Sequence, residues 1–269
     1  LCNAELREGK QHCQSGTPEF LAETITAAKQ MTKKPLLFRM DSGNDALENM
    51  LLLHWHDPQL KFLIKHNFRR EDRFAIAEEL KTVCQNVKHP RDGKAVYIGS
   101  TWRNFETEKG GSFVIRMVYE ITERTTAADG QEMLFPETGI DMYWTSLGVS
   151  DEEVIALYHN HAVCEQYHSE IKTDMGIECL PSGKFETNAL IFKLTMIAYN
   201  ILRIIGTAAM KGNDMPIRHS TIKRRRIRTV IDNLILLAGH LTDHARKLRL
   251  ALGHCNGWIY TFLRVAASF

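Results

Sequence analysis

The chain has 269 residues, enough for one large domain or two small ones. Its hydrophobic and charged fractions, 44% and 25%, are ordinary for a soluble globular protein, and a net charge of +2 says little about a partner. The six cysteines form no CxxC pair and no Cys/His spacing typical of a zinc site, which favours free thiols in a reducing cytosol. Nothing at the N-terminus resembles a signal peptide.

The first predicted elements are a helix and a short strand. Thr17 is a suitable N-cap and Pro18 a suitable first residue for a helix that runs to about Gln30. Residues 33–35, Lys-Lys-Pro, end this helix, and the apolar residues 36–38 predict a strand.

Asp41 follows this strand directly. Gly43 permits a tight turn, and Asp45 is a candidate N-cap for a second helix that extends to Trp55. Open α/β sheets place their ligand sites at the carboxyl ends of strands, so Asp41 is a candidate site residue. An ordinary turn or capping aspartate is the alternative.

The middle of the chain changes from helical to β character. Residues 61–66 (KFLIKH) predict a second strand and residues 70–87 a helix. Residues 95–147 predict strands, because four runs are rich in β-branched and aromatic residues: VYIGSTW, SFVIRMVYEITE, EMLFPE and DMYWTSL. The last run is expected to return the chain to the main sheet. Trp102 and Trp144 are candidates for stacking on DNA, although packing inside this β-rich block is the more common role.

A helix that begins at residues 150–153 carries the most informative stretch, YHNHAVCEQYHSEIK. Helical spacing keeps Tyr158, His161, Glu165 and Lys172 near one side. An acid flanked by a phenol, an imidazole and an ammonium group can hold a metal while its neighbours contact phosphates. The alternative is an amphipathic helix with a solvated, charged face.

The C-terminal part is predicted to be helical. Residues 185–205 are apolar nearly all round, which indicates a buried helix, since Lys193, Asn200 and Arg203 interrupt it too often for a membrane span. Residues 221–269 predict one or two amphipathic helices with a basic face. This region holds the basic run 217–228 and further cations at Arg246, Lys247, Arg249 and Arg264. Such clustering attracts phosphates, but it also occurs on solvated helix faces and basic loops.

Several of these segments together resemble the DDE transposases of bacterial insertion sequences that carry a Tyr-x2-Arg-x3-Glu-x6-Lys signature. In that family a catalytic aspartate follows an apolar strand. The segment FRMDSG resembles this region, so the family's aspartate corresponds to Asp41. Tyr158, Glu165 and Lys172 match the signature, while His161 stands where the family has arginine. The opening, NAELREGKQHCQSGTPEFL, and the segment IKTDMGIECLPSGKFETNALIFKLTMIAYNILR are also similar, so the resemblance covers nearly the whole chain.

The resemblance implies an α/β fold with a ribonuclease H-like core, incomplete at the N-terminus, a β-rich insertion and a helical C-terminal region. The corresponding divisions are residues 1–94 for the first part of the core, 95–147 for the insertion, 148–212 for the rest of the core and 213–269 for a basic helical region. It further implies a DNA transposase that cleaves phosphodiesters and transfers strands.

In such an enzyme Asp41 and Glu165 would be the catalytic metal ligands for two Mg²⁺ ions, with Mn²⁺ as a substitute. Tyr158, His161 and Lys172 would contact DNA phosphates. The basic run would add DNA contacts through Lys223, Arg224, Arg225 and Arg226. The implied partners are transposon-end and target DNA and a second copy on paired ends, in the bacterial cytoplasm and with no membrane.

The family's first catalytic aspartate precedes the segment that resembles residues 3–21, and no residue of this chain is assigned to that role. We therefore expect a fragment or a product of a decayed reading frame, inactive alone in DNA cleavage. Two alternatives stay open: a non-catalytic DNA-binding remnant, and an unrelated metal-dependent nuclease of similar fold with a further carboxylate.

Overall fold

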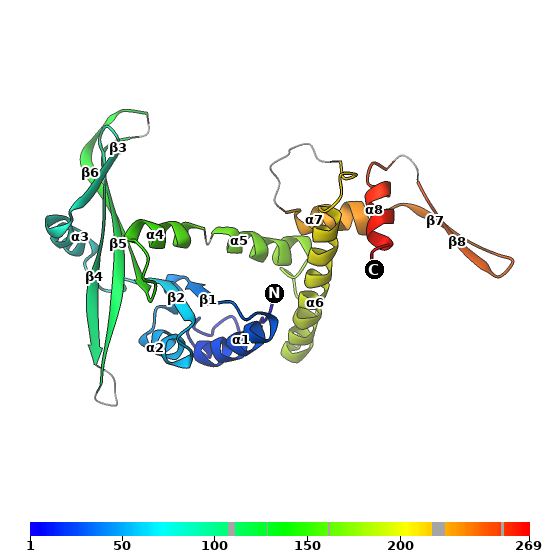
Figure 1. The fold of residues 1–269 in the computed structure, drawn as a ribbon, viewed down its shortest axis with the longest axis horizontal. Helices are drawn as coiled ribbons and strands as arrows, with labels where there is room; N and C mark the ends of the chain where they lie inside the picture. Colours follow the sequence, from blue (N-terminus) through cyan, green and yellow to red (C-terminus); the bar gives the residue numbers. More distant parts are fainter. Residues whose placement is uncertain (107–110, 128, 161, 217–223, 254–255) are drawn as a thin grey trace. The chain divides into compact units, whose positions relative to one another are not determined.

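The computed structural model describes residues 1–106, 111–127, 129–160, 162–216, 224–253 and 256–269 (Figure 1). The chain forms two compact units. We call residues 8–162 the sheet unit, and residues 1–7 together with 163–269 the helical unit. Each unit is described by itself.

The sheet unit is built on a mixed six-stranded sheet with the strand order β1-β2-β6-β5-β4-β3. β1 and β2 are parallel, with Phe38 opposite Phe62, and all other neighbours are antiparallel. The strands are β1 (Leu36–Met40), β2 (Leu60–Lys65), β3 (Asn86–Arg91), β4 (Lys94–Glu106), β5 (Ser112–Thr126) and β6 (Glu132–Thr145). Because β1 and β2 run in the same direction, the residues that follow them meet at one edge of the sheet.

Alternation along the strands gives this sheet two apolar faces. Phe62 and Ile64 of β2 belong to one buried cluster with Leu53 of α2, and Leu63 belongs to a second cluster with Val154 of α4. The first cluster also includes residues of the helices α1 and α3. The helices are α1 (Thr17–Met31), α2 (Leu47–His56), α3 (Arg73–Val83) and α4 (Asp151–His159). The sheet therefore carries helices on both faces.

The structure changes several predictions about the sheet unit. The helix expected at residues 70–87 ends at Val83, and β3 begins at Asn86. The runs EMLFPE and DMYWTSL lie in the single strand β6, whose end pairs with β2 and so confirms the return to the main sheet. Trp144 is buried as expected for a core residue, but Trp102, toward the end of β4, is 65% exposed.

The helix starts are confirmed in part. Ser150 caps α4, and its hydroxyl accepts the backbone N–H of Glu153. Gly16 rather than Thr17 is the N-cap of α1, with a left-handed φ of 74°, so Pro18 is the second residue of the helix rather than the first. Ala46 rather than Asp45 precedes α2, because the Asp45 carboxylate bonds elsewhere.

The helical unit consists mainly of short elements around one long helix. They are α5 (Ala162–Ser169), a π-helical turn η2 (Glu170–Asp174), α6 (Phe185–Ala209), α7 (Ile227–Val230), a second π-helical turn η3 (Ile231–Ile235), β7 (Gly239–His244), β8 (Lys247–Leu252) and α8 (Ile259–Ala266). Its apolar cluster joins Ala209, Val230 and Val265, one residue from each of the three helices α6, α7 and α8.

The single helix expected from Tyr158 through Lys172 is wrong. α4 ends at His159 with Asn160 as its C-cap, and α5 begins at Ala162, so Tyr158 and Glu165 lie on separate helices. Lys172 lies in the π-helical turn that follows α5. His161 is outside the described residues.

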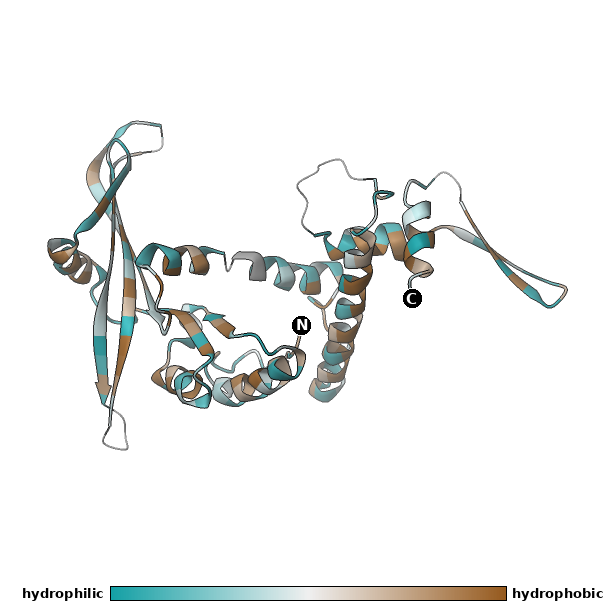
Figure 2. Ribbon diagram, viewed as in Figure 1, coloured by the Kyte–Doolittle hydropathy of each residue, from teal (hydrophilic) through white to brown (hydrophobic). Residues whose placement is uncertain are grey.

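The prediction that residues 185–205 form a buried helix is also wrong in part. Helix α6 buries Tyr199 and Gly206, but its opposite face exposes an apolar stripe: Leu190, Leu194, Ile197, Ile201 and Ile204 (Figure 2). Among the described residues, the short elements of the helical unit pack against the other side of α6, which explains the difference. By length and composition alone, α6 is long and apolar enough to cross a membrane.

The expectation of helices throughout residues 221–269 is corrected as well. Residues 239–252 form an antiparallel two-stranded hairpin, β7–β8, and the α-helices among the described residues of this range are α7 and α8. The periodicity of two in KLRLA explains this for β8, because polar and apolar residues alternate there as they do in a strand.

Candidate functional site

Asp41 is an exposed residue immediately after β1, and it opens a tight turn. A 3₁₀ turn, η1 (Ser42–Asn44), follows it, and the Asn44 backbone N–H donates to the Asp41 carbonyl at 3.1 Å. The Asn44 side chain reaches back and donates from Nδ2 to Asp41 Oδ1 at 2.7 Å. This contact fixes the orientation of the carboxylate before any ligand binds.

Four successive backbone carbonyls of this turn each accept a hydrogen bond from a side chain. Asn67 Nδ2 donates to Ser42 O at 3.2 Å, and the Cys13 thiol donates to Gly43 O at 3.0 Å. The other two donors are Asn49 Nδ2, 2.9 Å from Asn44 O, and Arg69 Nη2, 2.6 Å from Asp45 O.

These donors come from three parts of the sheet unit: the N-terminal segment, helix α2 and the loop after β2. Asn49 is fully buried and exchanges two further hydrogen bonds with Gln14, at 3.2 and 2.9 Å. A turn whose carbonyls are all bound has few alternative conformations, so Asp41 is presented by a rigid frame.

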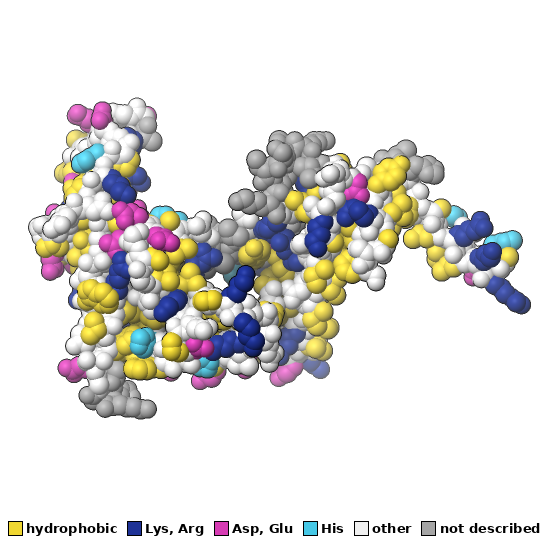
Figure 3. All heavy atoms as spheres, in the orientation of Figure 1, with side chains coloured by type: hydrophobic (Ala, Val, Ile, Leu, Met, Phe, Trp, Pro, Cys, Tyr) yellow, Lys and Arg dark blue, Asp and Glu magenta, His cyan; other side chains and the backbone are white. Residues whose placement is uncertain are grey.

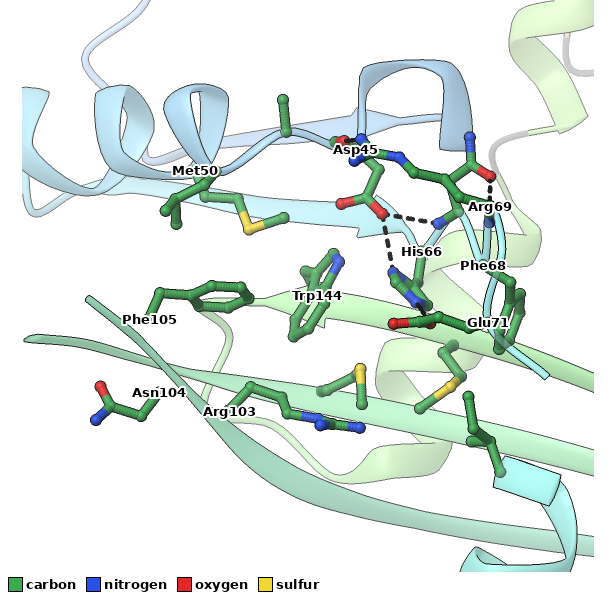
Figure 4. A pocket seen from close by; sticks show the side chains of 16 residues that line it. Asp45, Met50, His66, Phe68, Arg69, Glu71, Arg103, Asn104, Phe105 and Trp144 are labelled. Atoms are coloured by element: carbon green, nitrogen blue, oxygen red, sulfur yellow. Dashed lines mark hydrogen bonds and ion pairs between the residues drawn. The ribbon is translucent and has the colours of Figure 1, made fainter. Parts of the chain in front are cut away.

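Asp45 is a buried acid that anchors the turn from within (Figure 4). Its Oδ2 lies 2.8 Å from His66 Nδ1 and accepts the Asn67 backbone N–H at 2.8 Å. His66 Nε2 lies 2.8 Å from Glu71 Oε2, so the imidazole bridges two carboxylates. Burial lowers the pKa of His66, but the hydrogen bonds and charges of Asp45 and Glu71 outweigh it and raise that pKa above 6.5.

A cavity of about 380 Å³ lies beside this network. Trp144 and Phe105 form part of its apolar wall, with ring centroids 5.5 Å apart, and Arg103 lies at the same pocket (Figure 4). The rings of Phe68 and Trp144 pack edge-on against the His66 imidazole, with ring centroids 5.0 and 5.2 Å from its centroid. These contacts fix the imidazole and partly shield it from water.

Tyr158 lies at the end of α4 within the sheet unit, and the structure brings it near Asp41. Its ring packs against Tyr143 with centroids 4.6 Å apart. Burial raises the pKa of Tyr158 to about 12, with added contributions from the negative charges of Asp41 and Asp141. The Arg39 guanidinium, on β1, donates to the Leu157 carbonyl at 2.8 Å and holds the two elements together. The Tyr158 phenol is therefore neutral at physiological pH.

Glu165 and Lys172 are both exposed residues of the helical unit. Between them lies Glu170, which is only 1% exposed. The π-helical turn that contains Glu170 and Lys172 widens the helix locally, a feature often found at functional sites.

Glu170 is held by a dense set of donors. Arg224 Nη1 donates to both of its oxygens at 2.8 and 3.0 Å, the Tyr199 hydroxyl donates at 2.8 Å, and the Ile227 N–H donates at 3.3 Å. Burial, followed by the bond to Glu170, raises the pKa of Tyr199. Glu170 therefore ties the stretch that follows Glu165 to α6 and to the start of α7.

Asp174 forms a second anchor of the same stretch. Arg226 donates to it from Nε at 2.8 Å and from Nη2 at 3.0 Å, and the Arg228 N–H donates at 3.2 Å. Burial would raise the pKa of Asp174, but these hydrogen bonds and the charges of Arg226 and Arg228 lower it.

The predicted DNA-binding arginines thus have internal roles. The Arg224 and Arg226 guanidinium groups pair with Glu170 and Asp174, and Arg225 lies over the Trp258 ring at 5.5 Å. Lys223 is outside the described residues. The charge of Arg224 and Arg226 is partly neutralised, which reduces what they offer to a phosphate.

The structure brings together some of the predicted site residues. Asp41 and Tyr158 share the sheet unit, whereas Glu165 and Lys172 belong to the helical unit, so the convergence of Asp41 and Glu165 stays a prediction. Among the described residues, no group of three or more His, Cys, Asp or Glu side chains is arranged to hold a metal ion.

Sequence reasoning did not single out Asp45, His66 or Glu170 as anchoring residues. One signal for His66 was present: it follows β2, and parallel neighbours end at the same edge, where polar residues after one strand meet those after the other. For Glu170 no local signal exists, because its partner Arg224 is 54 residues away.

A comparison with protein families finds a match that extends over residues 1–268. The matching model is described as transposase DDE domain group 1. No curated protein matches the chain. Since the match covers all but one residue, the chain belongs to the family of DDE-domain transposases, proteins that act on DNA.

Proposed function

We propose that this protein is the DNA transposase of a bacterial insertion sequence, with a ribonuclease H-like core, and that Asp41 and Glu165 are metal-binding catalytic acids. The single observation that carries the proposal is the frame around Asp41: an exposed carboxylate at the end of a parallel strand, oriented by Asn44 and supported by four bound carbonyls.

The donor set fits a hard divalent cation. Asp41 and Glu165 supply exposed carboxylate oxygens, the ligands that Mg²⁺ and Mn²⁺ prefer, and hydrogen bonding of Asp41 Oδ1 to Asn44 is typical of a ligating carboxylate. When bound, a pair of such ions activates an attacking water or 3′-hydroxyl and stabilises the leaving oxygen. A DDE site uses a third acid, which we do not assign in this chain.

The remaining signature residues are proposed to bind DNA phosphates. A neutral Tyr158, with a pKa of about 12, can donate its O–H to a phosphate oxygen without adding charge. Lys172 adds a point charge, and His161 a donor that is cationic only when protonated. Transposon-end and target DNA would be the substrates, with two copies on paired ends in the bacterial cytoplasm.

The test is Mn²⁺ binding by the full chain, measured as loss of the free-ion electron paramagnetic resonance signal. Asp41→Asn and Glu165→Gln should each weaken binding at least about tenfold, because each removes one charged ligand. Asp92→Asn and Glu178→Gln are matched controls, since both acids are exposed and lie in the sheet and helical units respectively. Wild-type affinity in both site variants would disprove the proposed metal site.

A nicking assay on transposon-end DNA with Mg²⁺ completes the test. Because only two acids are assigned, we expect little cleavage by the chain alone. Strong cleavage that Glu165→Gln abolishes would show that another group replaces the third acid.

A non-catalytic DNA-binding role is the second candidate. It is favoured by the absence, among the described residues, of three clustered ligating side chains. This role predicts salt-sensitive DNA binding that neither Asp41→Asn nor Glu165→Gln changes, together with no specific Mn²⁺ binding.

A further inference from the structure

The β7–β8 hairpin is an amphipathic ribbon with all but one of its strand residues exposed. In its register His240 pairs with Ala251, Thr242 with Arg249 and His244 with Lys247. Directly opposed residues of an antiparallel pair lie on the same face, and successive residues alternate. One face therefore carries His240, Thr242, His244, Lys247 and Arg249.

The other face of the hairpin is mostly apolar and carries one acid, Asp243. Leu241 opposes Leu250, Gly239 opposes Leu252 and Asp243 opposes Leu248. Figure 3 shows Lys, Arg and His side chains together on this hairpin, beside hydrophobic ones. The ribbon thus presents its cations on one side and at the tip only, which gives it a definite binding orientation.

The hairpin cations differ from the other C-terminal cations in their partners. Arg224, Arg226 and Arg264 pair with Glu170, Asp174 and Asp214. Within the described part of the chain, Arg246, Lys247 and Arg249 have no ion pair or side-chain hydrogen bond, and they are exposed. Their charge is available to an external anion.

The tip of the hairpin has an unusual backbone. Ala245 and Arg246 both have a left-handed φ, 53° and 63°, which suits a tight two-residue hairpin turn but disfavours residues with a Cβ. Asn and Gly are the usual residues at such positions. An arginine in this turn projects a cation from the end of the ribbon, a placement that local stability does not explain.

We propose that the basic face and tip of the β7–β8 hairpin, Arg246, Lys247 and Arg249 with His240 and His244, bind the phosphates of double-stranded DNA. A two-stranded ribbon has the width to enter a major groove, and three cations along it match a row of phosphates. The proposal rests on the proposed function only for its partner, DNA, and not on Asp41 or Glu165.

The experiment measures binding of the full chain to a mixed-sequence duplex by fluorescence anisotropy, from about 50 to 300 mM salt. A triple variant, Arg246→Gln, Lys247→Gln and Arg249→Gln, removes the three cations. The slope of log K against log salt changes by about 0.9 for each phosphate contact, so we expect it to become shallower by 2 to 3 units, with at least about tenfold weaker binding at low salt.

Two controls isolate the surface. Lys184→Gln, Lys193→Gln and Lys211→Gln remove the same charge from exposed positions of the helical unit and should change the slope by less than about 0.5. Leu248→Gln alters the apolar face of the same hairpin and should leave the slope unchanged. If circular dichroism shows that the triple variant is unfolded, Lys247→Gln alone should still make the slope shallower by about 0.9.

The outcomes separate the two proposals. A triple variant with the salt slope of the lysine control overturns the hairpin surface while DNA binding stands. Wild-type protein that binds no duplex at any salt concentration overturns the DNA partner itself. Wild-type DNA binding by Asp41→Asn is compatible with the hairpin surface and leaves the metal site to the Mn²⁺ measurement.

Discussion

The regions around Asp41 and Glu165 share one arrangement and differ in how it is anchored. In each, an exposed acid precedes a buried acid: Asp45 follows Asp41, and Glu170 follows Glu165. The buried acid of the sheet unit pairs with a titratable imidazole, His66, whereas that of the helical unit pairs with a permanent guanidinium, Arg224. The comparison teaches that the inner acids supply the structural contacts, which leaves the outer acids facing solvent.

The largest expected effect is on the helical unit. Glu170→Ala leaves Arg224 and Tyr199 without their partner in a buried site, which should cost about 3–5 kcal/mol of unfolding free energy. Urea unfolding followed by circular dichroism measures this. Glu178→Ala, at an exposed position, should stay within about 0.5 kcal/mol. A loss below about 1 kcal/mol for Glu170→Ala would show that the inner acid is not an anchor.

The next effect concerns the sheet unit. Asp45→Asn removes the charge that faces His66 and weakens the bond from the Asn67 N–H, so we expect a loss of about 1.5–3 kcal/mol. Asp41→Asn is the matched control, because its exposed carboxylate should contribute little to stability. Equal losses in the two variants would remove the distinction between inner and outer acids.

A smaller effect is expected on metal binding rather than on stability. Asn44→Ala removes the donor to Asp41 Oδ1 and should weaken Mn²⁺ binding about tenfold. Asn86→Ala removes an equivalent contact, from an amide to the Glu152 carboxylate, at a place unrelated to the site. Unchanged affinity for Asn44→Ala, alongside a clear loss for Asp41→Asn, would mean that Asn44 does not position the carboxylate.

The smallest effect is a pH dependence confined to the sheet unit. The pKa of His66 is raised above its unfolded value of 6.5, so its stabilising contribution is complete below pH 6.5 and is lost as the pH rises through the folded pKa. Unfolding of the wild type from pH 5 to 8.5 should therefore show declining stability of this unit. His66→Phe should flatten that decline, and an unchanged slope would assign it to another group.

Much of the local structure could be predicted from the sequence. The apolar run at residues 36–38, the turn after Asp41 and the Ser150 cap depend on neighbouring residues, so their signals are local. The break between α4 and α5 could not, because helical spacing continues through residues 158–165 and no proline or glycine marks an end. The family also followed from the sequence, since its motifs lie in order along the chain.

The tertiary structure alone decided which cations pair with a carboxylate and which do not. The sequence shows Arg224 and Arg226 as cations of one basic run, yet folding places each beside a carboxylate more than 50 residues earlier. Arg246, Lys247 and Arg249 form a similar cluster of cations in the sequence, but they lie on an exposed ribbon. The reason is that the buried carboxylates of Glu170 and Asp174 require cationic partners, and spatial proximity between distant residues is set by packing rather than by local pattern.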